Sequence, residues 1–181
     1  MKIKNILLEE HEGAEGFEAT LQMPLMFIAF LMLLYFLFLG LAFIMYGNLA
    51  NTIAQDLNMR QSGYQATASY TTTPKILVHN STGSDPLAQN SFLDMSKITV
   101  TPYTTDLARA TNYALAKNQD GFNVPFAGVE SINVSTDKAV KQSDGTKMAG
   151  NVIKVTINFH CIIYGIDASI PMTVTGYNVI S

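Results

Sequence analysis

The sequence predicts an α+β fold: a long N-terminal transmembrane and stalk α-helix followed by a small antiparallel β-sheet domain that carries one helix. Three observations lead to this prediction. Residues 19–55 contain no charged side chain. Residues 96–181 contain several runs in which apolar and polar residues alternate, which is the period of a half-buried β-strand. One segment between these runs has apolar residues at helical spacing instead.

Charge is concentrated at the N-terminus. The chain has 181 residues, with 11 Lys+Arg and 14 Asp+Glu, for a net charge of −3. Residues 1–18 hold two lysines and five glutamates, whereas residues 56–181 hold nine bases and nine acids. Because bases and acids balance in residues 56–181, this part of the chain shows no basic patch, which argues against a nucleic-acid partner. A content of 48% hydrophobic residues argues against a disordered chain.

The first long element is a predicted membrane span, Met23 to Tyr46, which has almost no polar side chain. At about 1.5 Å per residue it would be about 36 Å long, longer than the ~30 Å hydrocarbon core of a bilayer. A soluble helix rarely stays apolar around its whole circumference for this length. The stretch is also too long for the apolar region of a cleaved secretory signal. We therefore expect a single crossing, with membrane lipid as a partner.

The helical pattern continues beyond the span to about Arg60. Leu49, Ile53 and Leu57 recur at four-residue intervals beside polar neighbours. Two lysines precede the span and one arginine closely follows it, which favours a cytoplasmic N-terminus and an extracytoplasmic C-terminal domain.

A carboxylate stands at the entrance of the span. An acid inside a bilayer costs about 2–3 kcal/mol, so Glu18 is expected either at the interface or beside a cation. Cleavage after Gly13 would create such a cation, the α-amino group of Ala14. Residues four apart share a helix face, so this amine and the Glu18 carboxylate could pair in register between stacked chains.

A short leader, a glycine, a glutamate five residues later and an apolar helix resemble the processing site of type IV pilin-like proteins. The finer pattern Glu18-Ala-Thr-Leu21-Gln-Met-Pro24 resembles the TadE-like family, the minor pseudopilins of tight-adherence (Tad) pili. The resemblance covers residues 13–60, about a quarter of the chain. Its C-terminal part is carried by a few small, polar and aromatic residues: Tyr46, Asn48, Ala50, Ala54 and Arg60.

The resemblance implies a structural minor subunit of a Tad or type IV-like pilus with a pilin-like lollipop fold. A prepilin peptidase would remove the leader, residues 1–13, by cutting between Gly13 and Ala14. The helix, residues 14–60, would then wait in the cell membrane until the pilus assembly machinery packs it against other pilin or pseudopilin subunits in a surface filament. Glu18 and Pro24 are the implied assembly residues, and a proline this far inside a helix would kink its axis.

Several alternatives stay open. The leader contains three further glutamates and is more acidic than such leaders usually are. A cut between Gly16 and Phe17 is a second candidate and would make Glu18 the second residue of the mature chain. The chain could instead be a filament-forming major pilin, bacterial or archaeal. From another functional class comes a single-pass extracytoplasmic binding or sensor module with an uncleaved signal anchor.

Residues 61–95 are rich in Ser, Thr, Asn and Gly, and we expect them to be irregular apart from a strand-like run at Lys75–Val78. Asn80 and Asn133 begin glycosylation acceptor triplets. Such triplets also arise by chance, so modification is left open.

Residues 96–181 form the predicted extracytoplasmic α+β head domain. Ile98–Thr101 alternates as a strand. The run Thr104-Thr105-Asp106 provides an N-cap and a first-turn acid for a helix that we expect to stop near Gly121. Ile132–Thr136 is a second expected strand.

The clearest strand pattern is Asn151–Tyr164. Its apolar face includes Cys161, which we expect in the core, and its polar face carries His160, which we expect at the surface. A final strand follows, and Pro171 indicates that it lies at an edge of the sheet or contains a bulge.

The residues suggest no catalytic, cofactor or metal site. His79 and His160 are far apart in the chain, with no third ligand at metal-binding spacing. A single cysteine provides neither an intramolecular disulfide nor a cysteine-based zinc site. The head's aspartates fall at turns and helix ends, an ordinary use of aspartate. We therefore expect a protein that is not an enzyme.

Overall fold

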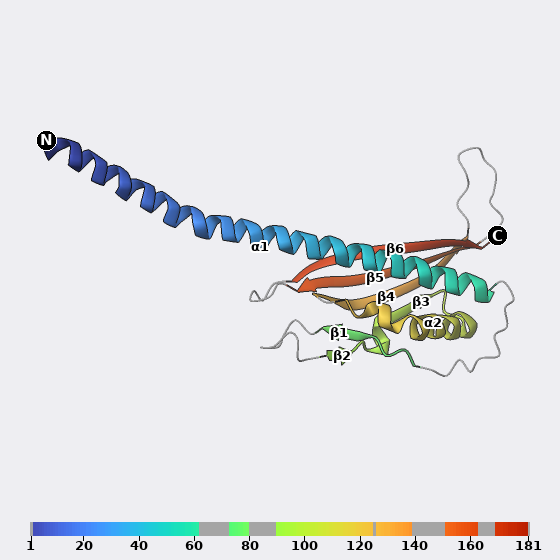
Figure 1. Ribbon diagram of the computed structural model, residues 1–181. Coiled ribbons are helices and arrows are strands. Elements are labelled where there is room, and N and C mark those ends of the chain that lie inside the picture. The colour runs from blue at the N-terminus through green and yellow to red at the C-terminus, as the bar shows by residue number, and fades with distance from the viewer. Residues whose placement is uncertain are drawn as a thin grey trace, which may run out of the picture. The chain divides into compact units, whose positions relative to one another are not determined.

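The computed structural model shows one long N-terminal helix followed by a four-stranded sheet and a second α-helix, which is the predicted α+β class (Figure 1). The chain divides into two compact units, Met1–Leu39 and Gly40–Ser181, and the second is hereafter called the α+β unit. Helix α1, Lys2–Gln61, contributes to both. The structure describes the following residues: 2–61, 73–79, 90–124, 126–138, 151–162 and 169–180.

Helix α1 changes character at Ala42. From Thr20 to Leu41 its side chains are exposed or half-buried. From Ala42 onward, buried side chains recur every three or four residues, which places them on one stripe of the helix. The buried residues are Ala42, Tyr46, Leu49, Ala50, Ile53, Ala54 and Leu57. The stripe predicted from Leu49, Ile53 and Leu57 is confirmed, and it begins about two turns earlier than expected.

Four strands form the main sheet, in the order β3-β4-β5-β6. Their bounds are Ile98–Thr101 for β3, Ala127–Lys138 for β4, Asn151–Ile162 for β5 and Ser169–Ile180 for β6. The β4–β5 and β5–β6 pairs are antiparallel, whereas β3 runs parallel to β4. The sheet is therefore mixed, and the expectation of a purely antiparallel sheet was wrong in this detail.

The parallel pair follows from helix α2, Thr105–Lys117, which lies between β3 and β4 in the chain. Parallel neighbours need a long crossover, usually a helix, that returns the chain to the same end of the sheet. The Thr104 hydroxyl accepts a hydrogen bond from the Leu107 backbone N–H at 3.2 Å, which confirms the predicted N-cap. Gly121, the expected stop, lies beyond α2 in the 3-10 helix η2, Gln119–Phe122.

A second, two-stranded sheet occupies part of the segment that we expected to be irregular. Strand β1, Leu77–His79, pairs antiparallel with β2, Asn90–Phe92. The strand-like run Lys75–Val78 thus overlaps β1 at its C-terminal end. A short 3-10 helix, η1, covers Met95–Lys97 and leads directly into β3.

The apolar face of β5 packs against α1. The ring centroids of Tyr46 and Phe159 lie 4.6 Å apart. The Tyr46 hydroxyl lies 3.3 Å from the carbonyl oxygen of Phe122 and 3.4 Å from that of Ala127 and donates to them. On the predicted apolar face, Ile163 lies outside the described residues, and the other members are buried: Ile153, Val155, Ile157, Phe159 and Cys161.

A carboxylate of α1 joins the two helices. Asp56 Oδ1 accepts from Lys117 Nζ at 2.8 Å, and Asp56 Oδ2 accepts from Asn118 Nδ2 at 2.9 Å. Lys117 occupies the last turn of α2, where a positive charge also complements the helix dipole. The end of α2 is thereby fastened to the C-terminal half of α1.

His160 differs from its prediction. The alternation along β5 places it on the polar face, yet only 9% of its surface is exposed. The β4–β5 register shifts between Val129 and Ser131, and such a bulge re-aims the side chain of the extra residue. That residue is Glu130, whose Oε1 lies 3.2 Å from His160 Nδ1. The surface assignment was therefore wrong, because the period-2 pattern of one strand does not show which side chains its partner strand places beside it.

Gly176 on β6 marks the closest approach of α1 to the sheet. A Cβ atom at this position would collide with backbone atoms of Ala50 and Asn51. Beside this contact, the Tyr177 N–H donates to Asn51 Oδ1 at 3.2 Å. About two turns further along α1, Asn58 Nδ2 donates to the side-chain oxygen of Asn178 at 2.8 Å. Only glycine allows the two backbones to come this close.

Replacing Gly176 with alanine should destabilise the α+β unit. Overpacking a tight contact typically costs about 1–3 kcal/mol, and we expect the upper part of this range because the obstructing atoms belong to backbone. Thermal unfolding of the full-length protein in detergent, followed by circular dichroism, measures the effect. Gly47→Ala is the matched control: its Cβ would meet nothing within 4 Å, and alanine favours the helix by up to about 1 kcal/mol. Equal melting temperatures for the two variants would contradict the Gly176 contact.

Cys161 should be unreactive in the folded protein. Only 2% of the Cys161 surface is exposed. Burial raises the pKa of the thiol, so little thiolate forms at neutral pH. We expect labelling by a thiol reagent at pH 8 to be at least about tenfold slower in the native protein than in guanidinium chloride, where local protection is lost. Native labelling at the unfolded rate would show that this position is accessible, and Cys161→Ser sets the background.

Candidate functional site

The largest exposed apolar surface in the described residues lies on α1 between residues 20 and 41, hereafter the apolar segment. Thirteen of its large side chains each expose between 47% and 77% of their surface. They are Leu21, Met23, Leu25, Met26, Phe27, Ile28, Phe30, Leu31, Met32, Leu33, Phe36, Leu37 and Leu41. Soluble monomers rarely expose a contiguous patch of this kind.

Over residues 20–33 the apolar segment is exposed on all sides of the helix, whereas Leu34, Tyr35, Phe38 and Leu39 are half-buried. Consecutive residues in an α-helix are about 100° apart, so the four residues Leu25–Ile28 already cover the full circumference. All four are more than half exposed. This pattern differs from the single buried stripe that begins at Ala42. A surface of this form suits a surrounding apolar medium or several neighbouring helices rather than one docking partner.

The length of the apolar segment matches a bilayer. Twenty-two residues span about 33 Å, close to the ~30 Å hydrocarbon core. The helical region Thr20–Asn58 is long and apolar enough to cross a membrane. The predicted span, Met23 to Tyr46, covers most of the apolar segment and extends to Ala42 and Tyr46, which are buried in the α+β unit.

The predicted processing and assembly residues all lie within α1. Gly13, Ala14, Gly16 and Glu18 are helical, and Ala14 and Glu18 are about one turn apart in the chain. Their side chains lie outside the described part of the structure. Pro24 is inside the helix and exposed, so its ring removes one backbone donor from the apolar segment.

The titratable groups that the structure describes in the α+β unit form no cluster that suggests chemistry. Among the described residues, no group of three or more His, Cys, Asp or Glu side chains could hold a metal ion. Asn133 is exposed on β4, whereas Asn80 lies outside the described residues. The buried Cys161 has a raised pKa, which makes it a poor nucleophile.

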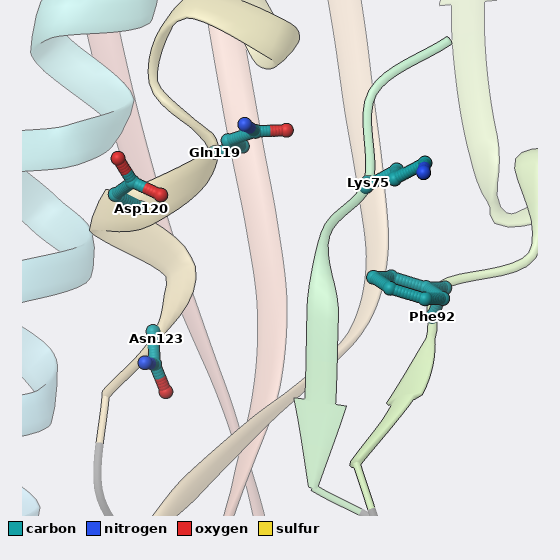
Figure 2. A pocket seen from close by; sticks show the side chains of 5 residues that line it. All are labelled: Lys75, Phe92, Gln119, Asp120 and Asn123. Atoms are coloured by element: carbon teal, nitrogen blue, oxygen red, sulfur yellow. The ribbon is translucent and has the colours of Figure 1, made fainter.

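A hollow on the α+β unit was missed by sequence reasoning. It has a volume of about 400 Å³ and lies between η2 and the β1–β2 sheet (Figure 2). Its lining comes from three separate parts of the chain: Lys75, Phe92, Gln119, Asp120 and Asn123. No motif joins these residues in the sequence, since only the fold brings them together.

Comparison with known proteins identifies no relative. No protein-family model, no curated protein and no solved structure matches this chain.

Proposed function

We propose that this protein is a structural minor subunit of a Tad or related type IV-like pilus, a pseudopilin assembled through α1. One observation carries the proposal. A single continuous helix, Lys2–Gln61, is apolar over residues 20–41, is exposed on all sides over residues 20–33, and then supplies a buried stripe to the α+β unit.

The continuity of α1 favours a filament subunit over a simple anchor. An anchor needs only a flexible tether to its domain, whereas here Tyr46, Ile53 and Leu57 are fully buried core residues of the same helix. Helix packing between subunits would therefore act directly on an element of the α+β core. A force that draws the apolar segment out of a membrane would then be transmitted through a continuous helix to the folded α+β unit.

The all-round exposure of the apolar segment fits two successive environments. In the membrane the segment would contact lipid. In a filament it would contact the corresponding segments of several neighbours, and exchanging lipid for equally apolar side chains involves little net hydrophobic free energy. Packing complementarity and a few polar contacts would then determine register, which is the role proposed for Glu18.

Glu18 and a new N-terminus at Ala14 would form the polar contact. A prepilin peptidase that cuts after Gly13 would remove the leader and its charges, leaving Glu15 and Glu18 as the acids before the apolar segment. A carboxylate at the edge of hydrocarbon is stabilised when it pairs with an α-amino group. In this proposal the N-terminus is cytoplasmic and the α+β unit extracytoplasmic, as the lysine bias favours.

Mass spectrometry of the membrane-extracted protein tests the processing step. In cells that contain a prepilin peptidase, we expect an N-terminus at Ala14. Gly13→Leu should block the cut, because a bulky side chain would stand next to the cleaved bond, whereas Gly16→Leu should be cleaved normally. The opposite pattern would assign the cut to Gly16–Phe17. An intact Met1 terminus in the unmodified protein would instead support an uncleaved single-pass anchor.

Substitution of Glu18 tests assembly separately from processing. Glu18→Ala removes the proposed partner of the Ala14 amine but leaves the cleaved bond unchanged, so we expect normal cleavage. The positive charge of the Ala14 amine would then be unpaired at the edge of the hydrocarbon. We therefore expect at least about a tenfold loss of subunit from sheared filaments. Immunoblots of sheared and membrane fractions measure both steps. Glu15→Ala is the matched control and should assemble normally. Unchanged incorporation of Glu18→Ala would remove this residue from its proposed role.

A further inference from the structure

We propose that the hollow between η2 and the β1–β2 sheet binds a neutral saccharide, with the Phe92 ring as a stacking platform and the amide and charged side chains around it as partners for hydroxyl groups. The hollow is hereafter called the η2 hollow. The proposal concerns the α+β unit alone and is independent of the pilin assignment.

The lining combines one aromatic ring with four polar side chains. Phe92 is 58% exposed, although a phenylalanine ring usually contributes to a core. Figure 2 shows Gln119, Asp120 and Asn123 on the η2 side, with Lys75 and Phe92 opposite them. The volume of about 400 Å³ lies within the range of small-molecule pockets.

The polar side chains are available for a ligand. All four are exposed, and none hydrogen-bonds another side chain within the described part of the chain. Amides both donate and accept, the Asp120 carboxylate accepts and the Lys75 ammonium donates. Hydroxyl groups also donate and accept, so a polyhydroxylated ligand could use every member of this set.

The charges of the lining argue against ionic ligands. Lys75 would attract a phosphate or carboxylate, but Asp120 would repel it, and the reverse holds for a cation. A single carboxylate is also too few for a calcium site, which takes six to eight oxygen ligands. A purely apolar ligand would leave the four polar groups without compensation. A neutral ligand with many hydroxyl groups fits these constraints.

The exposed Phe92 ring provides the apolar surface that a sugar ligand also needs. A sugar ring has one face of C–H groups, which is the apolar side that an aromatic ring can cover. Its rim carries the hydroxyl groups that polar neighbours can bind. The arrangement of Phe92 with Gln119 and Asn123 around one hollow therefore provides both kinds of contact.

Saturation-transfer NMR on the full-length protein tests the proposal. The probes are glucose, galactose, N-acetylglucosamine, maltose and cellobiose, with glucose 6-phosphate, glucosamine and adenosine as comparison ligands. The detergent must be zwitterionic without a sugar headgroup, because a glycoside detergent would compete. We expect millimolar binding of at least one neutral sugar and weaker binding of every comparison ligand.

Variants locate the binding in the η2 hollow. Phe92→Ala should weaken the bound sugar by at least about tenfold through loss of ring stacking, and Asn123→Ala by about threefold to tenfold through loss of a hydrogen bond. Phe92→Tyr keeps the ring and should retain binding. Tyr103→Ala is the matched control, since Tyr103 is an aromatic residue that is 76% exposed outside the hollow. Circular dichroism and melting temperature show whether each variant is folded.

Three outcomes would overturn the proposal. The first is no response from any neutral sugar. The second is tighter binding of glucose 6-phosphate, glucosamine or adenosine, which would assign the η2 hollow to another ligand class. The third is sugar binding that survives in both Phe92→Ala and Asn123→Ala, or that Tyr103→Ala also abolishes. Cleavage and filament incorporation of these variants are measured as above, so failure of this proposal is distinguishable from failure of the pilin assignment.

Discussion

The contact between α1 and β6 at Gly176 is the constraint on which the α+β unit depends. The absence of a side chain at this one position lets the helix backbone at Ala50 and Asn51 reach the strand. That approach allows Tyr46 to lie against Phe159 and its hydroxyl to reach the carbonyl oxygens of Phe122 and Ala127. Distant parts of the chain are thus held together by one helix, and a shift of that helix would disturb all of them.

The two halves of α1 have different surfaces. Over residues 20–33 no stripe is distinguished, because every position of the helix is exposed. From Asn48 onward the helix is amphipathic, and Asp56 binds Lys117 and Asn118 at the end of α2. A change from all-round to one-sided hydrophobicity within one helix indicates where a membrane-like environment gives way to a folded domain. The proposed pilin function uses this transition, since assembly and folding then share a single element.

Local patterns predicted more of this fold than they did of its contacts. The long helix, the Thr104 cap and the buried face of β5 each follow from the spacing of neighbouring residues, and the structure confirms them. The parallel β3–β4 pair, the burial of His160 and the η2 hollow depend on residues distant in the chain. Periodicity carries no information about which strand lies beside another or where a bulge falls. The candidate assembly residues are similarly visible only through a short motif, and the partners proposed for them would lie on other chains.

Two asparagines of α1, Asn51 and Asn58, bind backbone groups at an edge of the main sheet. β6 is the last strand of its sheet, and an outer strand can recruit a strand from another molecule through its free backbone groups. The Asn51 side chain accepts from the Tyr177 N–H, and Asn58 donates to the Val179 carbonyl oxygen, while Pro171 has no N–H to offer near the other end of the strand. These groups are already occupied or missing. A strand from another molecule would therefore find few free backbone groups at these positions of β6, which disfavours sheet-to-sheet aggregation.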